Sequence, residues 1–396
     1  MAQLNPPNVN DPFAWRLALA YAAFFLAAGW YMPLFPVWLA ASGLAPASIG
    51  LVLAAGQATR VVATPAGTRL TDRFGTLTGA IATAASATVV AVVLVANARG
   101  LTLILAAVVI YALVSAPIMP LIDAYALKGL AVRGRAYGPV RLWGSVAFIV
   151  ANLTGGVVLN ILAPGNLIWL IFAGNCTVAL AAVALIPMPR DTQPLQADAP
   201  REHSHLRRPA FLAIAAAGSL VQASHAVYYG FSTLDWSRQG YDGTTIGALW
   251  ALGVVAEIAL FALAGRLPAA LGPAALIGIG AAGAVLRWTA LACDPPAALM
   301  AALQLLHALS FGATHLGTML YLSRSAPESS RATMQGDVAT ANSVMMATAS
   351  AISGVLYGVS GSLAYAAMAA LAAGGGLFAF AAARLMRQPQ SAGTGG

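Results

Sequence analysis

Eight ionisable side chains interrupt the long apolar runs of this sequence, and these are the positions at which we expect its chemistry. They are Arg60, Asp123, Arg141, His225, Glu257, Arg287, His307 and His315. A charge inside an apolar run is costly in free energy, because lipid solvates it poorly. Each of these side chains is therefore a candidate for binding a substrate, for carrying a proton or for a structural ion pair.

Asp123 and Arg141 stand eighteen residues apart and lie in consecutive apolar runs. Consecutive helices joined by a short loop are usually neighbours, so the two side chains can meet as an ion pair. Such a pair either locks two helices together or forms part of a substrate or gating site. The sequence leaves both alternatives open.

Glu257 and Arg287 interrupt two later apolar runs, in the segments LGVVAEIALF and AVLRWTAL. An arginine stays charged, so Arg287 needs an anion, and Glu257 is the obvious partner. A carboxylate in such a place can also take up a proton or bind a substrate. We expect Glu257 to be linked to protons, with a structural salt bridge as the alternative.

Polar and aromatic side chains gather in two further runs. Gln304 lies three residues before His307 and shares its helical face, while His225 precedes Tyr228 and Tyr229 by about one turn. Aromatic rings beside hydrogen-bonding groups suit an amphipathic organic ligand. A satisfied core histidine or an ordinary contact between helices is the alternative.

The composition excludes several classes of protein. The chain has 396 residues, of which 60% are hydrophobic and 8% are charged, whereas soluble domains carry about 25% charged residues. Its net charge is +8, but the basic residues lie in short loops between apolar runs, so we expect no nucleic-acid partner. Cys176 and Cys293 form no disulfide framework or metal-ligand spacing. No phosphate-binding loop or catalytic motif occurs, so neither an enzyme nor a cofactor is expected.

Twelve runs are long and apolar enough to cross a membrane as helices. They are 15–40, 47–68, 77–97, 101–127, 138–162, 166–186, 210–235, 244–266, 272–292, 296–321, 332–358 and 361–384. Ten or eleven spans are the alternative, because neighbouring runs almost touch near Gly100 and near Gly358. A polar, proline-rich connector at 187–209 separates six runs from six. The sequence therefore predicts an all-α membrane protein of two six-helix halves, 1–186 and 210–387, with a disordered tail at 388–396.

Lysine and arginine predict the orientation of these runs. If the N-terminus is inside, fourteen basic residues fall in inner loops and only Arg99 and Arg238 fall in outer loops. We therefore expect a multi-pass protein of the bacterial inner membrane, with both termini and the connector on the cytoplasmic side. Arg60, near the inner end of its run, is expected to extend to the membrane interface.

The segment GTRLTDRFG, which begins at Gly67, is expected to be a tight turn containing Asp72 and Arg73. With twelve runs and a central connector, it resembles the loop signature of the major facilitator superfamily. That resemblance implies the fold of these transporters and a gating role for Asp72 and Arg73. The segment departs from the signature, because Gly67 stands five residues before Asp72 instead of four and an uncharged pair starting at Thr76 replaces a basic pair.

Longer segments resemble the 3-phenylpropionate permease branch, which in turn resembles the lactose permease type of proton symporter. They are VRLWGSVAFI at 140–149, QASHAVYYGFS at 222–232, GALWALGVVAEI at 247–258, VLRW at 285–288 and QLLHALSFGATHL at 304–316. By this resemblance Asp123 and Arg141 bind substrate, Glu257 couples the site to protons, and Arg287 and His307 complete the site.

The chain departs from the sugar symporters at four positions. Tyr228 and Gln304 replace an acid–lysine pair, Ser310 replaces a glutamate used in proton release, and Phe148 replaces a tryptophan that stacks on the sugar. Both charges of this buried pair are absent together, as expected, because removing only one would leave the other without a partner. A sugar substrate is therefore less expected than an aromatic one.

We therefore expect a proton-coupled importer of a small organic substrate, such as an aromatic carboxylate resembling 3-phenylpropionate, that works by alternating access as a monomer. The expected substrate-binding residues are Asp123, Arg141, Trp143, Phe148, His225, Tyr228, Tyr229, Arg287 and Gln304, and the proton-coupling residues are Glu257 and His307. A sugar or nucleoside proton symporter is the alternative, followed by drug efflux and by a non-transporting membrane sensor or enzyme.

Overall fold

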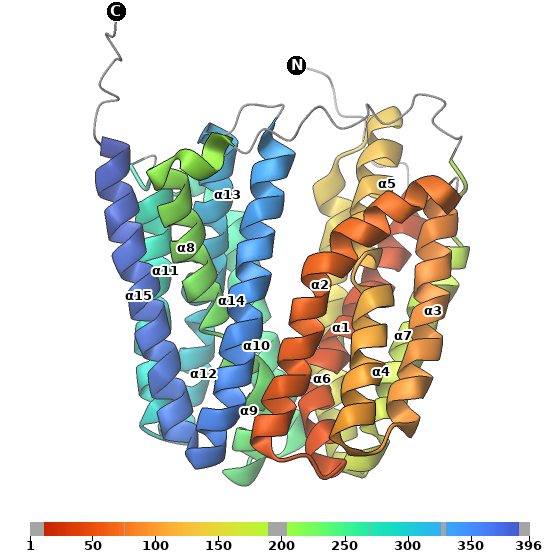
Figure 1. Ribbon diagram of the computed structural model, residues 1–396, viewed down its shortest axis with the longest axis horizontal. Coiled ribbons are helices and arrows are strands. Elements are labelled where there is room, and N and C mark those ends of the chain that lie inside the picture. Colours follow the sequence, from red (N-terminus) through yellow and green to blue (C-terminus); the bar gives the residue numbers. More distant parts are fainter. Residues whose placement is uncertain (1–11, 75, 189–203, 269, 326–329, 388–396) are drawn as a thin grey trace, which may run out of the picture. The chain divides into compact units, whose positions relative to one another are not determined.

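The computed structural model describes residues 12–74, 76–188, 204–268, 270–325 and 330–387, and within these ranges every regular element is a helix (Figure 1). The first half of the chain forms α1 (Pro12–Ala41), α2 (Pro46–Phe74), α3 (Leu77–Asn97), α4 (Gly100–Ser115), α5 (Ile118–Val132), α6 (Tyr137–Ile161), η1 (Pro164–Asn166) and α7 (Leu167–Val183). The second half forms η2 (Ser204–Arg207), α8 (Pro209–Ala223), α9 (Ala226–Arg238), α10 (Gly243–Leu263), η3 (Ala264–Arg266), α11 (Pro273–Ala292), α12 (Ala297–Leu305), η4 (Ala308–Ala313), α13 (Thr314–Ser325), α14 (Arg331–Val359) and α15 (Gly361–Arg387).

The predicted number of membrane spans is confirmed. In the described part of the chain, twelve helical stretches are long and apolar enough to cross a membrane. Each of them matches one of the twelve predicted runs to within a few residues at either end. The all-α membrane fold expected from the sequence is therefore correct.

The segment expected to be a turn after the second run is helical instead. α2 continues past its apolar part to Phe74, so Asp72 and Arg73 lie in a helix and not in a loop. The expected connector at 187–209 lies mostly outside the described residues, as does the tail at 388–396. The boundaries of the two halves stay a prediction.

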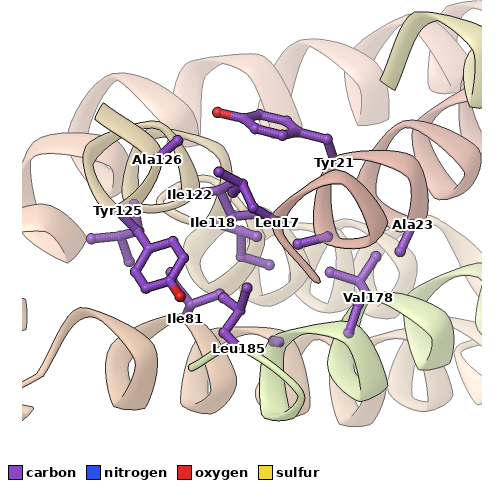
Figure 2. Packing of buried hydrophobic residues seen from close by; sticks show 14 of the residues in the cluster. Leu17, Tyr21, Ala23, Ile81, Ile118, Ile122, Tyr125, Ala126, Val178 and Leu185 are labelled. Carbon is purple, nitrogen blue, oxygen red and sulfur yellow. The ribbon is translucent and has the colours of Figure 1, made fainter. Parts of the chain in front are cut away.

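The chain folds into two compact units. The first unit contains residues 1–195, 228–254 and 350–358, and the second contains residues 196–227, 255–349 and 359–396. The core of the first unit lies where α1, α3, α5 and α7 meet. Figure 2 shows residues of this core, among them Leu17, Ile81, Ile122, Tyr125 and Val178.

Three of the twelve spans are broken near their middle. The fourth is interrupted between α4 and α5, at Ala116 and Pro117, because proline cannot continue the hydrogen-bond ladder. The seventh breaks at Ser224 and His225, whose side chains bond the carbonyl of Val221 in place of backbone groups. In the tenth, η4 is a single stretch of π-helix, a form that is frequent at functional sites.

Glycines bring helix backbones of the first unit into direct contact. A Cβ atom on Gly354 of α14 would lie 2.5 Å from the carbonyl oxygen of Pro46 and 2.7 Å from the Cα atom of Gly50 in α2. Gly156 of α6 and Gly247 of α10 make the same kind of approach, with 2.9 Å between a Cβ atom on one and the Cα atom of the other. Small residues stabilise helix pairs in membranes because they let the backbones approach.

We therefore expect Gly354→Ala to lower stability by about 1–3 kcal/mol, since the added methyl group meets backbone atoms that cannot rotate away. The matched control is Gly374→Ala in α15, where a Cβ atom meets nothing within 4 Å. That variant is expected to be neutral or slightly stabilising, because alanine is the better helix former. Thermal unfolding of the purified variants measures the difference, and equal midpoints for the two variants would contradict the packing argument.

Candidate functional site

The polar side chains of the second unit meet around Arg287 of α11, which is fully buried. Its Nη2 atom donates to Oε1 of Gln304, and its Nη1 atom lies 3.1 Å from Nδ1 of His307. The Nε2 atom of His307 faces Oε2 of Glu257 at 3.7 Å. We call Glu257, Arg287, Gln304 and His307 the Arg287 cluster. The residues expected to cooperate from the sequence are therefore brought together, with His307 between Glu257 and Arg287.

The contact with Arg287 fixes the tautomer of His307. A guanidinium only donates hydrogen bonds, so Nδ1 of His307 accepts and carries no proton. The ring proton then lies on Nε2, the atom that faces Glu257. In this arrangement His307 is a neutral donor toward the glutamate, and a second proton on its ring would face the guanidinium.

His225 has the opposite tautomer. Its Nδ1 atom lies 3.2 Å from the carbonyl oxygen of Val221, so this nitrogen donates. Its Nε2 atom therefore accepts, and the partner is the hydroxyl of Ser310 at 3.1 Å. The break in the seventh span and the π-helical stretch of the tenth thus place the two side chains against each other. The ring of His225 also lies 5.5 Å from that of His307, which joins this pair to the Arg287 cluster.

The Arg287 cluster retains a donor for a ligand. Gln304 is fully buried, and its Nε2 atom has no hydrogen-bond partner among the described residues. A buried amide nitrogen left in this state costs free energy, so a bound molecule or water with an acceptor atom would stabilise it. Phe311 stacks on His307 at 5.2 Å and gives the cluster an aromatic neighbour.

In the first unit, Asp123 of α5 is held by two tyrosines. Its Oδ1 atom accepts hydrogen bonds from the hydroxyls of Tyr21 at 2.6 Å and Tyr137 at 2.8 Å. The expected ion pair with Arg141 is replaced by this arrangement. Tyr21 lies between Asp123 and Arg141, because its hydroxyl donates to Asp123 and the guanidinium of Arg141 lies 5.4 Å from the centre of the Tyr21 ring.

Arg141 of α6 lies against aromatic rings. Its guanidinium carbon stands 4.0 Å from the ring centre of Phe25, and Phe25 in turn contacts Phe148 edge-on at 6.5 Å. Gly144 makes room for this, since a Cβ atom there would lie 2.9 Å from Nη1 of Arg141. Among the described residues, Arg141 makes no ion pair with a carboxylate. Its positive charge therefore lies beside the aromatic rings of Tyr21 and Phe25.

Trp143 does not join this group. Its side chain is 58% exposed and lies on the stripe of α6 that bears Val146, Val150 and Val157, which are exposed as well. Phe148, one turn beyond Gly144, lies on the opposite face with Arg141. Of the two aromatic residues expected on α6, only Phe148 therefore joins the rings near Arg141, through its contact with Phe25.

The two tyrosines of α9 pack as aromatic core in the first unit. Tyr228 is buried and stacks on Trp250 at 4.5 Å, and Tyr229 lies 6.2 Å from the same ring. The indole of Trp250 donates to the hydroxyl of Thr233. The structure brings these tyrosines together with Trp250, and a substrate-binding role for them stays a prediction.

Four contributors were missed by the sequence reasoning. They are Tyr21, Phe25 and Tyr137, which surround Asp123 and Arg141, and Ser310, which bonds His225. Tyr21 and Phe25 are aromatic residues in an apolar run, and Tyr137 directly precedes another run, so nothing in the sequence sets these three apart. Ser310 had a signal, since it stands where the sugar symporters have a functional glutamate.

Comparisons with known proteins agree with this architecture. The model of the MFS_1 like family matches residues 14–367. The chain is 32% identical over 315 residues to the probable 3-phenylpropionic acid transporter of Escherichia coli (strain K12), covering 77% of this chain and 81% of that protein. It is 26% identical over 319 residues to the maltose permease of Geobacillus stearothermophilus, covering 78% and 79% of the two chains.

Solved structures share the fold. The nucleoside transporter NupG superposes with a TM-score of 0.80 at 14% identity, covering 95% of this chain and 100% of the other. The inward open xylose transporter XylE from Escherichia coli superposes with a TM-score of 0.72 at 12% identity, covering 96% and 98%. Identities this low establish the fold alone.

The two tyrosine hydroxyls on Asp123 predict a stability effect. Tyr21→Phe removes a hydrogen bond to the half-buried carboxylate of Asp123, so we expect a loss of about 1.5–3 kcal/mol. Tyr241→Phe, in the loop before α10, is the matched control, because the structure gives that hydroxyl no hydrogen bond within the described residues. Thermal unfolding distinguishes them, and a Tyr21→Phe midpoint equal to that of the control would show that the bond contributes nothing.

Proposed function

Because the chain belongs to the MFS_1 like family, and is thus a multi-pass transporter of the major facilitator superfamily, we propose that it imports a small aromatic carboxylate together with protons by alternating access. The matched family and the similar proteins described above are transporters and not enzymes. The relative named as a 3-phenylpropionic acid transporter supports an aromatic acid as the substrate class.

The observation that favours this substrate most is the environment of Arg141. Its guanidinium lies 4.0 Å from the ring of Phe25 and makes no ion pair among the described residues. A guanidinium binds a carboxylate with two parallel hydrogen bonds, while neighbouring rings pack against an aromatic group. A molecule with an acid at one end and a ring at the other satisfies both requirements.

The charge balance of the first half supports an anionic substrate. The six apolar runs of this half contain three basic residues, Arg16, Arg60 and Arg141, and one acidic residue, Asp123. The carboxylate of Asp123 already accepts two tyrosine hydroxyls. A bound carboxylate would add the negative charge that the interior of this half lacks.

The tautomer of His307 favours Glu257 as the group that carries the proton. Since Nδ1 of His307 accepts from Arg287, an added proton has no place on that ring without breaking the contact. Glu257 is 20% exposed and faces the Nε2–H group of His307, so it can take up a proton and become a neutral carboxylic acid. Release of that proton from Glu257 on the other side of the membrane would complete one transport step.

The same proposal includes topology and assembly. The fourteen basic residues of the inner loops favour both termini in the cytoplasm and a bacterial inner membrane. Asp72 and Arg73, at the end of α2, are proposed to act in gating, and the transporter is proposed to work as a monomer.

A proton-coupled sugar symporter is the second candidate. The similarity to a maltose permease, which extends over 78% of this chain, favours it. The aromatic surroundings of Arg141 favour the acid instead. Competition separates the two, because excess maltose would inhibit uptake of radiolabelled 3-phenylpropionate only if the site accepts sugars.

Uptake into proteoliposomes under an imposed pH gradient tests the coupling. We expect the wild type to accumulate 3-phenylpropionate, and Glu257→Gln to bind it but lose accumulation, because glutamine cannot carry a proton. Asp294→Asn is the matched control, since it removes an exposed carboxylate at a positive-φ position that asparagine tolerates. Accumulation by Glu257→Gln at the wild-type level would refute the assignment of the proton to Glu257.

Replacement of Arg141 tests the carboxylate anchor. Arg141→Ala is expected to weaken binding of 3-phenylpropionate about 10–100-fold, which corresponds to the loss of charge-assisted hydrogen bonds. Binding of the neutral 3-phenylpropanol is expected to change little. The exposed Arg266→Ala serves as control. If Arg141→Ala weakens both ligands equally, the side chain acts through packing and the anchor is wrong.

A further inference from the structure

Arg60 is a membrane-embedded cation that the proposed transport site does not use. It is the fifteenth of the 29 residues of α2, so about 21 Å of helix extend from it in either direction. The apolar part of α2 continues to Thr68, about 12 Å beyond Arg60 along the helix axis. This length exceeds the reach of an arginine side chain, so the structure does not support the expectation that Arg60 extends to the interface.

The packing of α2 on α4 places Arg60 beside Tyr111. The two helices are separated by one span and therefore run in the same direction, and a Cβ atom on Gly56 would lie 3.6 Å from Cγ1 of Val108. Arg60 follows Gly56 by one turn and Tyr111 follows Val108 by three residues, so both reach the same depth. The charge of Arg60 acts on the hydroxyls of Tyr111 and Tyr31.

Tyr111 and Tyr31 form an aromatic wall. Their rings stack at 5.5 Å with an interplanar angle of 14°, and Tyr31 stacks in turn on Phe35 at 4.6 Å. Each tyrosine also has a hydroxyl that can donate a hydrogen bond. A guanidinium, two phenolic donors and stacked rings are therefore gathered between α1, α2 and α4.

The described part of the chain offers Arg60 no anionic partner. Among the described residues it makes no hydrogen bond and no ion pair. The acidic residues between residues 12 and 186 are Asp72, which lies beyond the apolar part of the same helix, and Asp123, which is bonded to Tyr21 and Tyr137. An arginine cannot shed its charge, so a ligand anion is the remaining way to stabilise it.

We propose that Arg60, Tyr31 and Tyr111 form a second binding site, separate from Arg141, for the carboxylate of an aromatic acid. Arg60 binds the carboxylate, the two hydroxyls donate to it, and the substrate ring packs on the tyrosines. Tyr31 projects about 80–120° around α1 from Tyr21 and Phe25, which face Arg141, so the two sites lie on different faces of that helix. The proposal rests on the anionic substrate class of the proposed function.

Calorimetric titration of the purified full chain tests it, with 3-phenylpropionate as the probe and 3-phenylpropanamide as the neutral comparison. The wild type is expected to show two classes of site for the acid. Arg60→Gln is expected to weaken one class by at least about tenfold and to leave the other, whereas Arg141→Gln does the reverse. Arg99→Gln, at an exposed turn of the same unit, is the matched control.

Two milder variants keep the test informative if Arg60→Gln does not fold. Arg60→Lys keeps the charge and is expected to retain the site in weakened form, and Tyr111→Phe removes one donor and is expected to weaken it about threefold to tenfold. Thermal unfolding without ligand identifies any variant that is merely unstable.

The outcomes separate the two proposals. If the wild type shows one class of site that only Arg141→Gln weakens, the Arg60 site is refuted and the proposed function stands. If that one class is weakened by Arg60→Gln instead, the Arg60 site stands and Arg141 is not the anchor. If chloride displaces the acid from the Arg60 site as readily as benzoate does, or if the wild type binds no carboxylate, the proposed site for an aromatic acid is refuted.

Discussion

The absence of water inside a membrane is the constraint on which this structure depends. Every buried charge or donor must find its partner within the protein or in a ligand, because lipid supplies none. Asp123 meets this requirement with the hydroxyls of Tyr21 and Tyr137, and Arg287 meets it with Gln304 and His307. Arg141 lies against aromatic rings and makes no ion pair among the described residues, which is the physical reason for proposing that it binds an anionic substrate.

Local breaks in the helices determine which polar groups can meet. An unbroken helix bonds its own backbone and directs its side chains with a fixed period. In the seventh span, Ser224 and His225 interrupt that ladder, and in the tenth the π-helical stretch adds a residue to one turn. These two irregularities bring His225 to Ser310 and leave His307 between Arg287 and Glu257. The tautomers of both histidines follow from the partners that this geometry gives them.

The first unit combines close backbone packing with a polar interior. Glycine contacts join α2 to α14 and α6 to α10, so the helices there are held by backbone approach rather than by large side chains. Aromatic residues of α1 then occupy the space toward α4, α5 and α6, where they contact Asp123, Arg141 and Tyr111. Within the first six apolar runs, the basic residues Arg16, Arg60 and Arg141 outnumber the single acidic residue, Asp123.

The sequence by itself determined the number of spans, their ends to within a few residues and the identity of the costly charges, because apolar length and intramembrane charge are properties of local sequence. It also indicated the partnership of Glu257, Arg287 and His307. Only the tertiary structure decided that α2 continues through Asp72 and Arg73, that tyrosines replace Arg141 as partners of Asp123, and that Trp143 faces outward while Phe148 faces the cation. Such partners come from different helices and depend on rotation and backbone breaks, and a tyrosine or phenylalanine in an apolar run gives no local sign of which neighbour its ring will meet.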